Sequence, residues 1–169
     1  MIRTAGPADA VPLASIHHRA AVAAYAGIFP PDPPAPTAAD LLPDWEALIA
    51  DPEVDVLVAE RRNANGRSAS QLIGGATVEP DATVPTGWKL GRLYVDPDAW
   101  GTGAGSSLHD AALDAARRRG ATRINLWVLE ANTRARTMYE QRSWVLVPGR
   151  TLPNDPPWVL DVLYERTLP

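Results

Sequence analysis

Residues 89–140 read KLGRLYVDPDAWGTGAGSSLHDAALDAARRRGATRINLWVLEANTRARTMYE, and the rest of the chain is best understood from this stretch. Its pattern predicts an apolar strand, a glycine-rich turn, an alanine-rich helix, a second strand and a short helix opened by Asn132. At the turn, the first N–H groups of the helix lack intrahelical acceptors. Glycines let the backbone approach a ligand closely, and the helix dipole favours an anion there. The stretch therefore predicts a phosphate- or pyrophosphate-binding helix start.

Two familiar glycine-rich motifs do not fit this turn. A P-loop needs a Gly-Lys-Ser/Thr ending, and no lysine follows these glycines. A dinucleotide fingerprint needs G-x-G-x-x-G in the first βαβ unit and an acid about 20 residues on. Here Gly101, Gly103 and Gly105 lie past the middle of the chain, and the next strand carries Asn125 instead. A purely structural strand-to-helix connection stays open as an alternative.

Two motifs in the right order carry a resemblance to a known family. The first is Leu93-Tyr94-Val95-Asp96-Pro97 followed by Trp100-Gly101-Thr102-Gly103-Ala104-Gly105, and the second comprises Asn132, Ala135, Tyr139 and Glu140. Together they resemble the GNAT superfamily of N-acetyltransferases, whose acetyl-CoA loop reads Q/R-x-x-G-x-G/A. The chain departs from that pattern in having Trp100 at the Q/R position and Ser143-Trp144 in place of Gly-Phe.

The resemblance implies an α/β (α+β) fold with the GNAT architecture. A central mixed, mostly antiparallel sheet of six to seven strands would be flanked by about four helices, with a splayed parallel strand pair that admits CoA. The length suits a single domain over residues 1–169. Strands are expected at 1–5, 54–62, 71–78, 88–95, 123–129, 144–147 and 158–166, and helices at 8–26, 37–50, 103–119 and 132–142. A polar hairpin connection is expected at 63–68, and a proline-rich loop at 148–157.

The function implied by the resemblance is transfer of an acetyl group from acetyl-CoA to a primary amine. The acceptor would be a small molecule or a peptide that attacks the thioester directly in a ternary complex. A transferase that uses a longer acyl-CoA and a non-catalytic acyl-CoA-binding or regulatory module remain alternatives. The residues expected to bind CoA are Leu93, Tyr94, Val95, Trp100, Gly101, Thr102, Gly103, Ala104, Gly105, Ser106, Asn132 and Arg136.

The resemblance also assigns a proton donor, Tyr139, which matches the tyrosine that protonates the leaving thiolate. The base is less defined, because Lys89 stands where many members carry glutamate. Glu79 is the expected substitute, with His17, His18, Asp96 or a chain of waters as alternatives. Tyr25, Ile28 and Phe29 are expected to line the acceptor pocket, because the region between the first two helices covers that pocket in the family.

Composition excludes several other classes of protein. A net charge of −4 argues against binding nucleic acid through phosphate neutralisation. The absence of cysteine excludes thiolate metal sites and disulfides, and no metal is expected. No apolar run reaches membrane-spanning length and no signal peptide is visible, so we expect a cytoplasmic protein. A homodimer through the strands around Trp144 and Trp158 is possible on this pattern.

Overall fold

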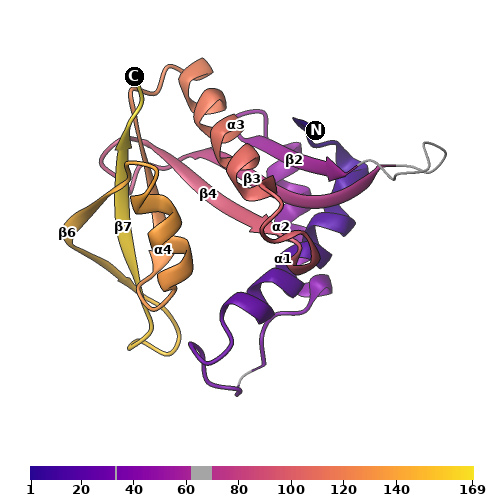
Figure 1. The fold of residues 1–169 in the computed structure, drawn as a ribbon, viewed down its shortest axis with the longest axis horizontal. Coiled ribbons are helices and arrows are strands. Elements are labelled where there is room, and N and C mark those ends of the chain that lie inside the picture. Colours follow the sequence, from indigo (N-terminus) through magenta and orange to yellow (C-terminus); the bar gives the residue numbers. More distant parts are fainter. Residues whose placement is uncertain (33, 62–69) are drawn as a thin grey trace.

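The computed structural model describes residues 1–32, 34–61 and 70–169. Within these residues seven strands form one sheet in the order β1-β2-β3-β4-β5-β7-β6 (Figure 1). The strands are β1 (Ile2–Thr4), β2 (Asp55–Arg61), β3 (Gln71–Pro80), β4 (Trp88–Val95), β5 (Arg123–Leu129), β6 (Val145–Pro153) and β7 (Leu160–Thr167). The α-helices are α1 (Ala10–Ala24), α2 (Ala38–Ala50), α3 (Ala104–Arg118) and α4 (Thr133–Glu140), with short 3-10 turns at Pro7–Asp9 and Pro97–Ala99. The expected GNAT architecture is confirmed.

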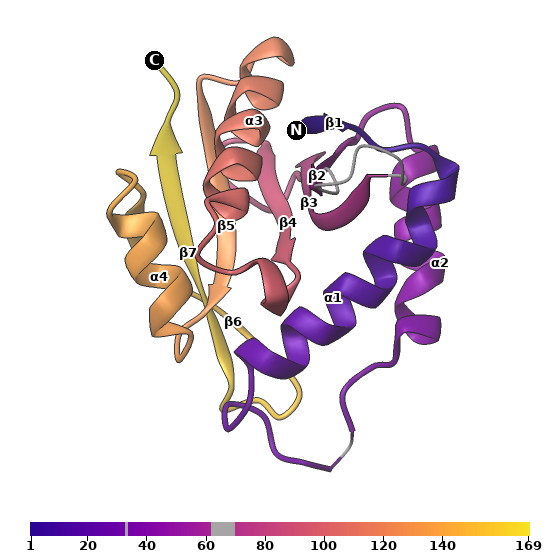
Figure 2. The same cartoon turned by 45° about the vertical axis from the view of Figure 1, so that its right-hand side comes forward.

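Helices cover both faces of the sheet, as Figure 2 shows for α1 and α2 on one side and α3 on the other. The sequence of β2 explains this arrangement, because alternate strand residues point to opposite faces. Leu57 and Ala59 belong to the core that includes α3, while Val56 and Val58 belong to the core beneath α1 and α2. A strand buried on both faces therefore reads as a continuous apolar run rather than an alternating one.

The two middle strands, β4 and β5, are parallel and touch at one end. Their backbone register consists of the single pair Lys89 and Asn125, and every other ladder in the sheet is antiparallel. Asn125 is fully buried, donates from Nδ2 to the Tyr164 carbonyl at 3.0 Å and accepts from the Thr86 hydroxyl at 3.0 Å. Beyond this pinned end β4 and β5 diverge (Figure 2), so the expected splayed pair is present.

Local capping chemistry sets where the helices begin. Thr37 and Asp40 form a reciprocal capping box at the start of α2, so Pro43 further along does not displace that start. Gly103 precedes α3 in the left-handed conformation, with φ of +86°. Asn132 caps α4 by accepting from the Ala135 N–H at 3.2 Å.

The closing strands differ from the sequence-based expectation. Strand β6 continues to Pro153, so residues 148–153 of the predicted proline-rich loop are strand instead. Its ladder to β7 shifts register between Leu146 and Thr151, which accommodates the segment containing Pro148. Because β6 lies at the sheet edge, a proline there needs no ladder N–H. The predicted connection at 63–68 lies outside the described residues.

The two late tryptophans have different environments. Trp144 is 2% exposed and donates from Nε1 to Nε2 of the buried His109 at 2.9 Å, so it belongs to the core. Trp158 is 75% exposed. None of the helices in the described part of the chain is both long and apolar enough to cross a membrane.

Candidate active site

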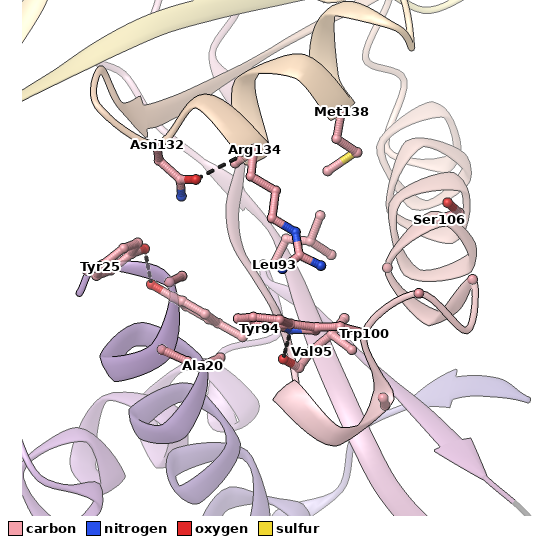
Figure 3. A pocket seen from close by; sticks show the side chains of 17 residues that line it. Ala20, Tyr25, Leu93, Tyr94, Val95, Trp100, Ser106, Asn132, Arg134 and Met138 are labelled. Atoms are coloured by element: carbon pink, nitrogen blue, oxygen red, sulfur yellow. Dashed lines mark hydrogen bonds between the residues drawn. The ribbon is translucent and has the colours of Figure 1, made fainter. Parts of the chain in front are cut away.

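A first cavity lies beside the glycine-rich turn, between the end of α1, the end of β4 and the start of α4 (Figure 3). Its volume is about 530 Å³. Nine of the twelve residues expected to bind CoA line it. These are Leu93, Tyr94, Val95, Trp100, Gly101, Gly103, Gly105, Ser106 and Asn132.

The turn itself has the backbone geometry of an anion site. Gly101 and Gly103 have φ of +78° and +86°, a conformation that L side chains rarely adopt. A Cβ at Gly103 would meet nothing within 4 Å, so the space above this residue is open. The first helical hydrogen bond runs from Ser107 N to Gly103 O at 3.0 Å. The N–H groups just before Ser107 therefore lie at the helix start, where intrahelical acceptors are missing and the dipole favours an anion.

Trp100, at the Q/R position of the GNAT motif, lines this cavity and contacts both β4 and α4. Its Nε1 donates to the Val95 carbonyl at 2.8 Å. The Arg134 guanidinium carbon lies 4.1 Å from the Trp100 ring centroid, a cation–π arrangement between the turn and α4 (Figure 3). In the described residues no carboxylate lies within 4.0 Å of Arg134. The cavity therefore has an unneutralised guanidinium beside its glycine turn.

Arg136, the arginine expected to bind CoA, lies elsewhere. Its Nε donates to the Tyr164 hydroxyl at 3.0 Å and its Nη1 to the Glu130 carbonyl at 3.0 Å. Residues two apart on a helix point in very different directions, so Arg134 and Arg136 cannot share a face. Thr102 and Ala104 are also absent from the cavity lining, and the Thr102 hydroxyl donates to the Ala99 carbonyl at 2.7 Å.

A second cavity of about 330 Å³ adjoins the first, and both share Tyr25, Leu93, Tyr94, Asn132 and Ala135 in their walls. The second cavity contains the predicted proton donor and two of the three residues expected at the acceptor pocket. Its lining comprises Tyr25, Phe29, Leu90, Gly91, Arg92, Leu93, Tyr94, Trp127, Val128, Leu129, Asn132, Ala135, Tyr139, Asn154 and Asp161. Ile28 is not among them.

Tyr139 is held firmly at the wall of the second cavity. It is 8% exposed, and its ring packs edge-on against Trp144 with centroids 5.8 Å apart. Burial, followed by the nearby Tyr94, raises the pKa of Tyr139 above its ordinary value. The phenol therefore stays protonated at neutral pH and is able to donate its proton.

Tyr25 and Tyr94 line both cavities, and His17 of α1 packs behind Tyr94. The hydroxyls of Tyr25 and Tyr94 are 3.3 Å apart, and the His17 ring stacks on Tyr94 with centroids 3.8 Å apart. Burial, and then the charge of Arg92, lower the pKa of His17 to about 4. His17 is therefore neutral at pH 7. His18 points elsewhere, with its Nδ1 2.8 Å from the Pro36 carbonyl.

The expected base, Glu79, is outside the lining of both cavities. Its carboxylate accepts from the Thr77 hydroxyl at 2.6 Å and lies 3.5 Å from Lys89 and 3.4 Å from Arg92. The alternative Asp96 is 7% exposed and pairs with Arg19 at 2.5 Å. Lys89 itself contacts Asp81 at 2.9 Å. Asp161, which sequence reasoning missed, does line the second cavity.

No group of three or more His, Cys, Asp or Glu side chains suited to a metal ion occurs in the described residues.

Comparison with known proteins indicates the family of this chain. The model of the acetyltransferase (GNAT) family matches residues 19–144. That match runs from the last part of α1 through β5 and α4, and it includes the two motifs on which the resemblance rested.

Individual relatives match over shorter stretches. Mycothiol acetyltransferase of Beutenbergia cavernae is 44% identical over 68 residues, which are 40% of this chain and 22% of the relative. The Thermobispora bispora protein of the same name is 36% identical over 80 residues, or 46% of this chain and 23% of the relative. The matched parts thus cover less than a quarter of these relatives.

Solved structures match over nearly the whole chain. The PaiA N-acetyltransferase of Thermoplasma acidophilum, in complex with coenzyme A, has a TM-score of 0.70 at 19% identity and covers 99% of this chain and 98% of its own. Salmonella typhimurium yncA, with acetyl-CoA, has a TM-score of 0.69 at 20% identity and covers 100% and 94%. These likenesses establish the fold, and the family match over residues 19–144 establishes membership: the chain belongs to the acetyltransferase (GNAT) family.

Proposed function

We propose that this chain transfers an acetyl group from acetyl-CoA to a primary amine of a small molecule or peptide, by direct attack in a ternary complex. The observation that carries the proposal is a pair of adjoining cavities, the first between α1, the end of β4 and α4, and the second between β4 and β5. One contains a helix start suited to phosphates, and the other contains a protonated tyrosine. Relatives of the same fold have been solved with coenzyme A and with acetyl-CoA, which supports this assignment of the donor.

The residues of the first cavity fit the chemistry of CoA. The N–H groups at the start of α3 would bind the pyrophosphate, with Arg134 supplying a cation beside the turn. Leu93 and Val95 would present backbone groups of β4 to the amides of the pantetheine arm. The Val95 carbonyl already accepts one bond from Trp100, which leaves it one further lone pair. Asn132 lines both cavities and would lie beside the arm where it passes from one to the other.

Reaction would occur where the thioester enters the second cavity. Holding donor and acceptor side by side supplies much of the rate, because the attack becomes effectively unimolecular. The amine must be neutral when it attacks, and the thiolate must receive a proton as it leaves. Tyr139 is the proton donor in this proposal. Glu79 stays a prediction for the base, acting through water from behind Gly91, where its carboxylate lies.

The test is calorimetric titration of the purified chain with acetyl-CoA and with free CoA, followed by thiol release with a broad panel of amines. We expect both ligands to bind and at least one amine to stimulate thiol release. Binding without turnover across the panel would instead support the non-catalytic acyl-CoA-binding module. Turnover only with longer acyl donors would support the alternative transferase. Absence of binding by any acyl-CoA would refute the proposal.

A further inference from the structure

The second cavity contains a carboxylate that none of the roles above uses. Asp161 lies on β7, between Leu129 of β5 and Leu152 of β6 in the sheet register. Cross-strand partners share a face, so Asp161 and Leu129 point to the same side of the sheet. Among the described lining residues of both cavities, Asp161 is the single acidic side chain. An amine that enters the cavity would meet this carboxylate.

The carboxylate of Asp161 is only partly satisfied by the protein. Asn154 donates from Nδ2 to Oδ2 at 3.1 Å, and no Lys, Arg or His nitrogen of the described residues lies within 4.0 Å. Burial raises the pKa of Asp161, and its charge in turn contributes to the raised pKa of Tyr25 and of Tyr94. A half-buried carboxylate without a cation is costly unless a ligand supplies one.

The other charged group in this cavity has partners of its own. The Arg92 guanidinium lies 3.2 Å from Asp44 and 3.4 Å from Glu79, and it stacks over the Trp45 ring at 5.5 Å. The cation of Arg92 is therefore shared between two carboxylates, whereas Asp161 is not neutralised by the described residues. The balance of charge in the second cavity favours a cationic ligand.

We propose that Asp161 binds the ammonium group of the acceptor and takes its proton, and that the acceptor is a primary amine on an apolar or aromatic body. This proposal rests on the proposed function and deepens it. The body of the acceptor would pack against the apolar wall formed by Phe29, Leu90, Trp127 and Leu129. Aromatic walls favour a flat partner, and the 330 Å³ volume suits a small one.

The proton balance is complete with these groups. The ammonium gives one proton to Asp161, which later releases it to solvent. The neutral nitrogen then forms a bond to the thioester carbonyl carbon, and the carbon–sulfur bond breaks with its electron pair going to sulfur. Tyr139 protonates that sulfur, and the second proton lost by the nitrogen restores the phenol. The products are the amide, free CoA and one proton in solution.

The test uses phenethylamine as the acceptor probe and 2-phenylethanol as its uncharged analogue. Asp161→Asn is compared with Glu165→Gln, a matched acid-to-amide change on the same strand whose side chain pairs with Arg123. We expect phenethylamine to bind the protein–CoA complex at least tenfold more tightly than 2-phenylethanol at pH 7. Asp161→Asn should remove this preference and lower kcat/KM by 100-fold or more, while acetyl-CoA affinity stays within twofold. Glu165→Gln should change neither quantity.

The dependence of kcat/KM on pH distinguishes a role of Asp161 as base from a role in binding alone. In the wild type, kcat/KM should fall as acid protonates the carboxylate, and this limb should be lost in Asp161→Asn. The other titratable side chains that line the cavity are Arg92, Tyr25, Tyr94 and Tyr139. Burial raises the pKa of all three tyrosines, so they stay neutral between pH 5 and 8. Loss of the limb in Glu79→Gln instead of Asp161→Asn would overturn the proposal in favour of Glu79.

Two further outcomes separate this proposal from the proposed function. A wild type that binds acetyl-CoA but neither binds nor acetylates phenethylamine would overturn the acceptor class and leave the donor site intact. A wild type that binds no acetyl-CoA would refute the proposed function and this inference with it. Should Asp161→Asn fail to fold, equal wild-type affinities for phenethylamine and 2-phenylethanol would still refute the role of Asp161.

Discussion

Gly103 and Gly105 lie two residues apart at the start of α3, and replacing each with alanine should affect a different property. Gly103→Ala should lower stability, and Gly105→Ala should lower acetyl-CoA affinity without lowering stability. Gly103 has φ of +86°, while an added Cβ would meet nothing within 4 Å. The change Gly103→Ala therefore introduces backbone strain without a clash, and left-handed backbone costs an L residue about 1–2 kcal/mol. We expect the free energy of unfolding to fall by that amount.

Gly105 has no positive φ and lies in the first turn of α3. Its added Cβ would meet the Val95 Cγ2 atom at 3.6 Å, an ordinary van der Waals contact. Because alanine is the better helix former, Gly105→Ala should leave stability unchanged or raise it by up to about 1 kcal/mol. The new methyl group would nevertheless lie in the lining of the first cavity. By displacing the phosphate from one N–H, a hydrogen bond worth about 1.5–3 kcal/mol, this methyl group should lower acetyl-CoA affinity about tenfold or more.

Urea denaturation and calorimetric titration of both variants measure these effects separately. The reasoning requires Gly105→Ala to lose affinity without losing stability, and Gly103→Ala to lose stability. If Gly105→Ala bound acetyl-CoA as tightly as the wild type, the anion site would not lie at this helix start. If Gly103→Ala were as stable as the wild type, the left-handed turn would not be a constraint of the folded chain.

Three further predictions address the other parts of the site. Arg134→Ala should weaken acetyl-CoA binding about tenfold by calorimetry. Arg134→Lys keeps the charge but not the planar stack on Trp100, so its affinity should fall by less. Wild-type affinity in both variants would exclude a phosphate contact by Arg134. Tyr139→Phe should lower kcat by about 100-fold with unchanged acetyl-CoA affinity, and an unchanged kcat would refute its role as acid. His17 has a folded-state pKa of about 4, below the ordinary 6.5, so its contribution to stability is complete above pH 6.5 and declines as the pH falls toward 4. His17→Phe should reduce the slope of unfolding free energy against pH by up to about 1.4 kcal/mol per pH unit in that range, and parallel urea-denaturation profiles would contradict this.

The elements around the glycine turn could be predicted closely because their signals are local. Strands 88–95 and 123–129 have the predicted bounds, since apolar runs end there at turn residues. The starts of α2 and α4 follow from side-chain caps at Thr37 and Asn132. Strand β6 was mispredicted because Pro148 and Gly149 suggest a loop, whereas an edge strand tolerates both.

Helical spacing separates Arg134 and Arg136, the two arginines within α4, onto different faces. Met138 lines the first cavity, and Arg134 lies four residues before it, on the same helix face. Arg136 lies four residues before Glu140 and approaches it at 3.9 Å, on another face. Helical spacing from a known cavity residue would therefore have selected Arg134. The motif alone could not, because it matches residue types and not directions.

The two cavities differ in how much of the chain is needed to build them, and this difference explains why sequence patterns reach the lining of the first cavity more fully than that of the second. The donor side is formed mainly by β4, the turn and the start of α3, which follow one another in sequence and take their geometry from glycine dihedrals and a helix end. The acceptor side brings together Phe29, Trp127 and Asp161 from distant segments. Asp161 reaches it only because β7 inserts between β5 and β6, so that a residue near the C-terminus faces Leu129. A short motif therefore predicts the proposed donor site, while the residues of the proposed acceptor site depend on strand order, and proteins sharing the turn are free to differ there.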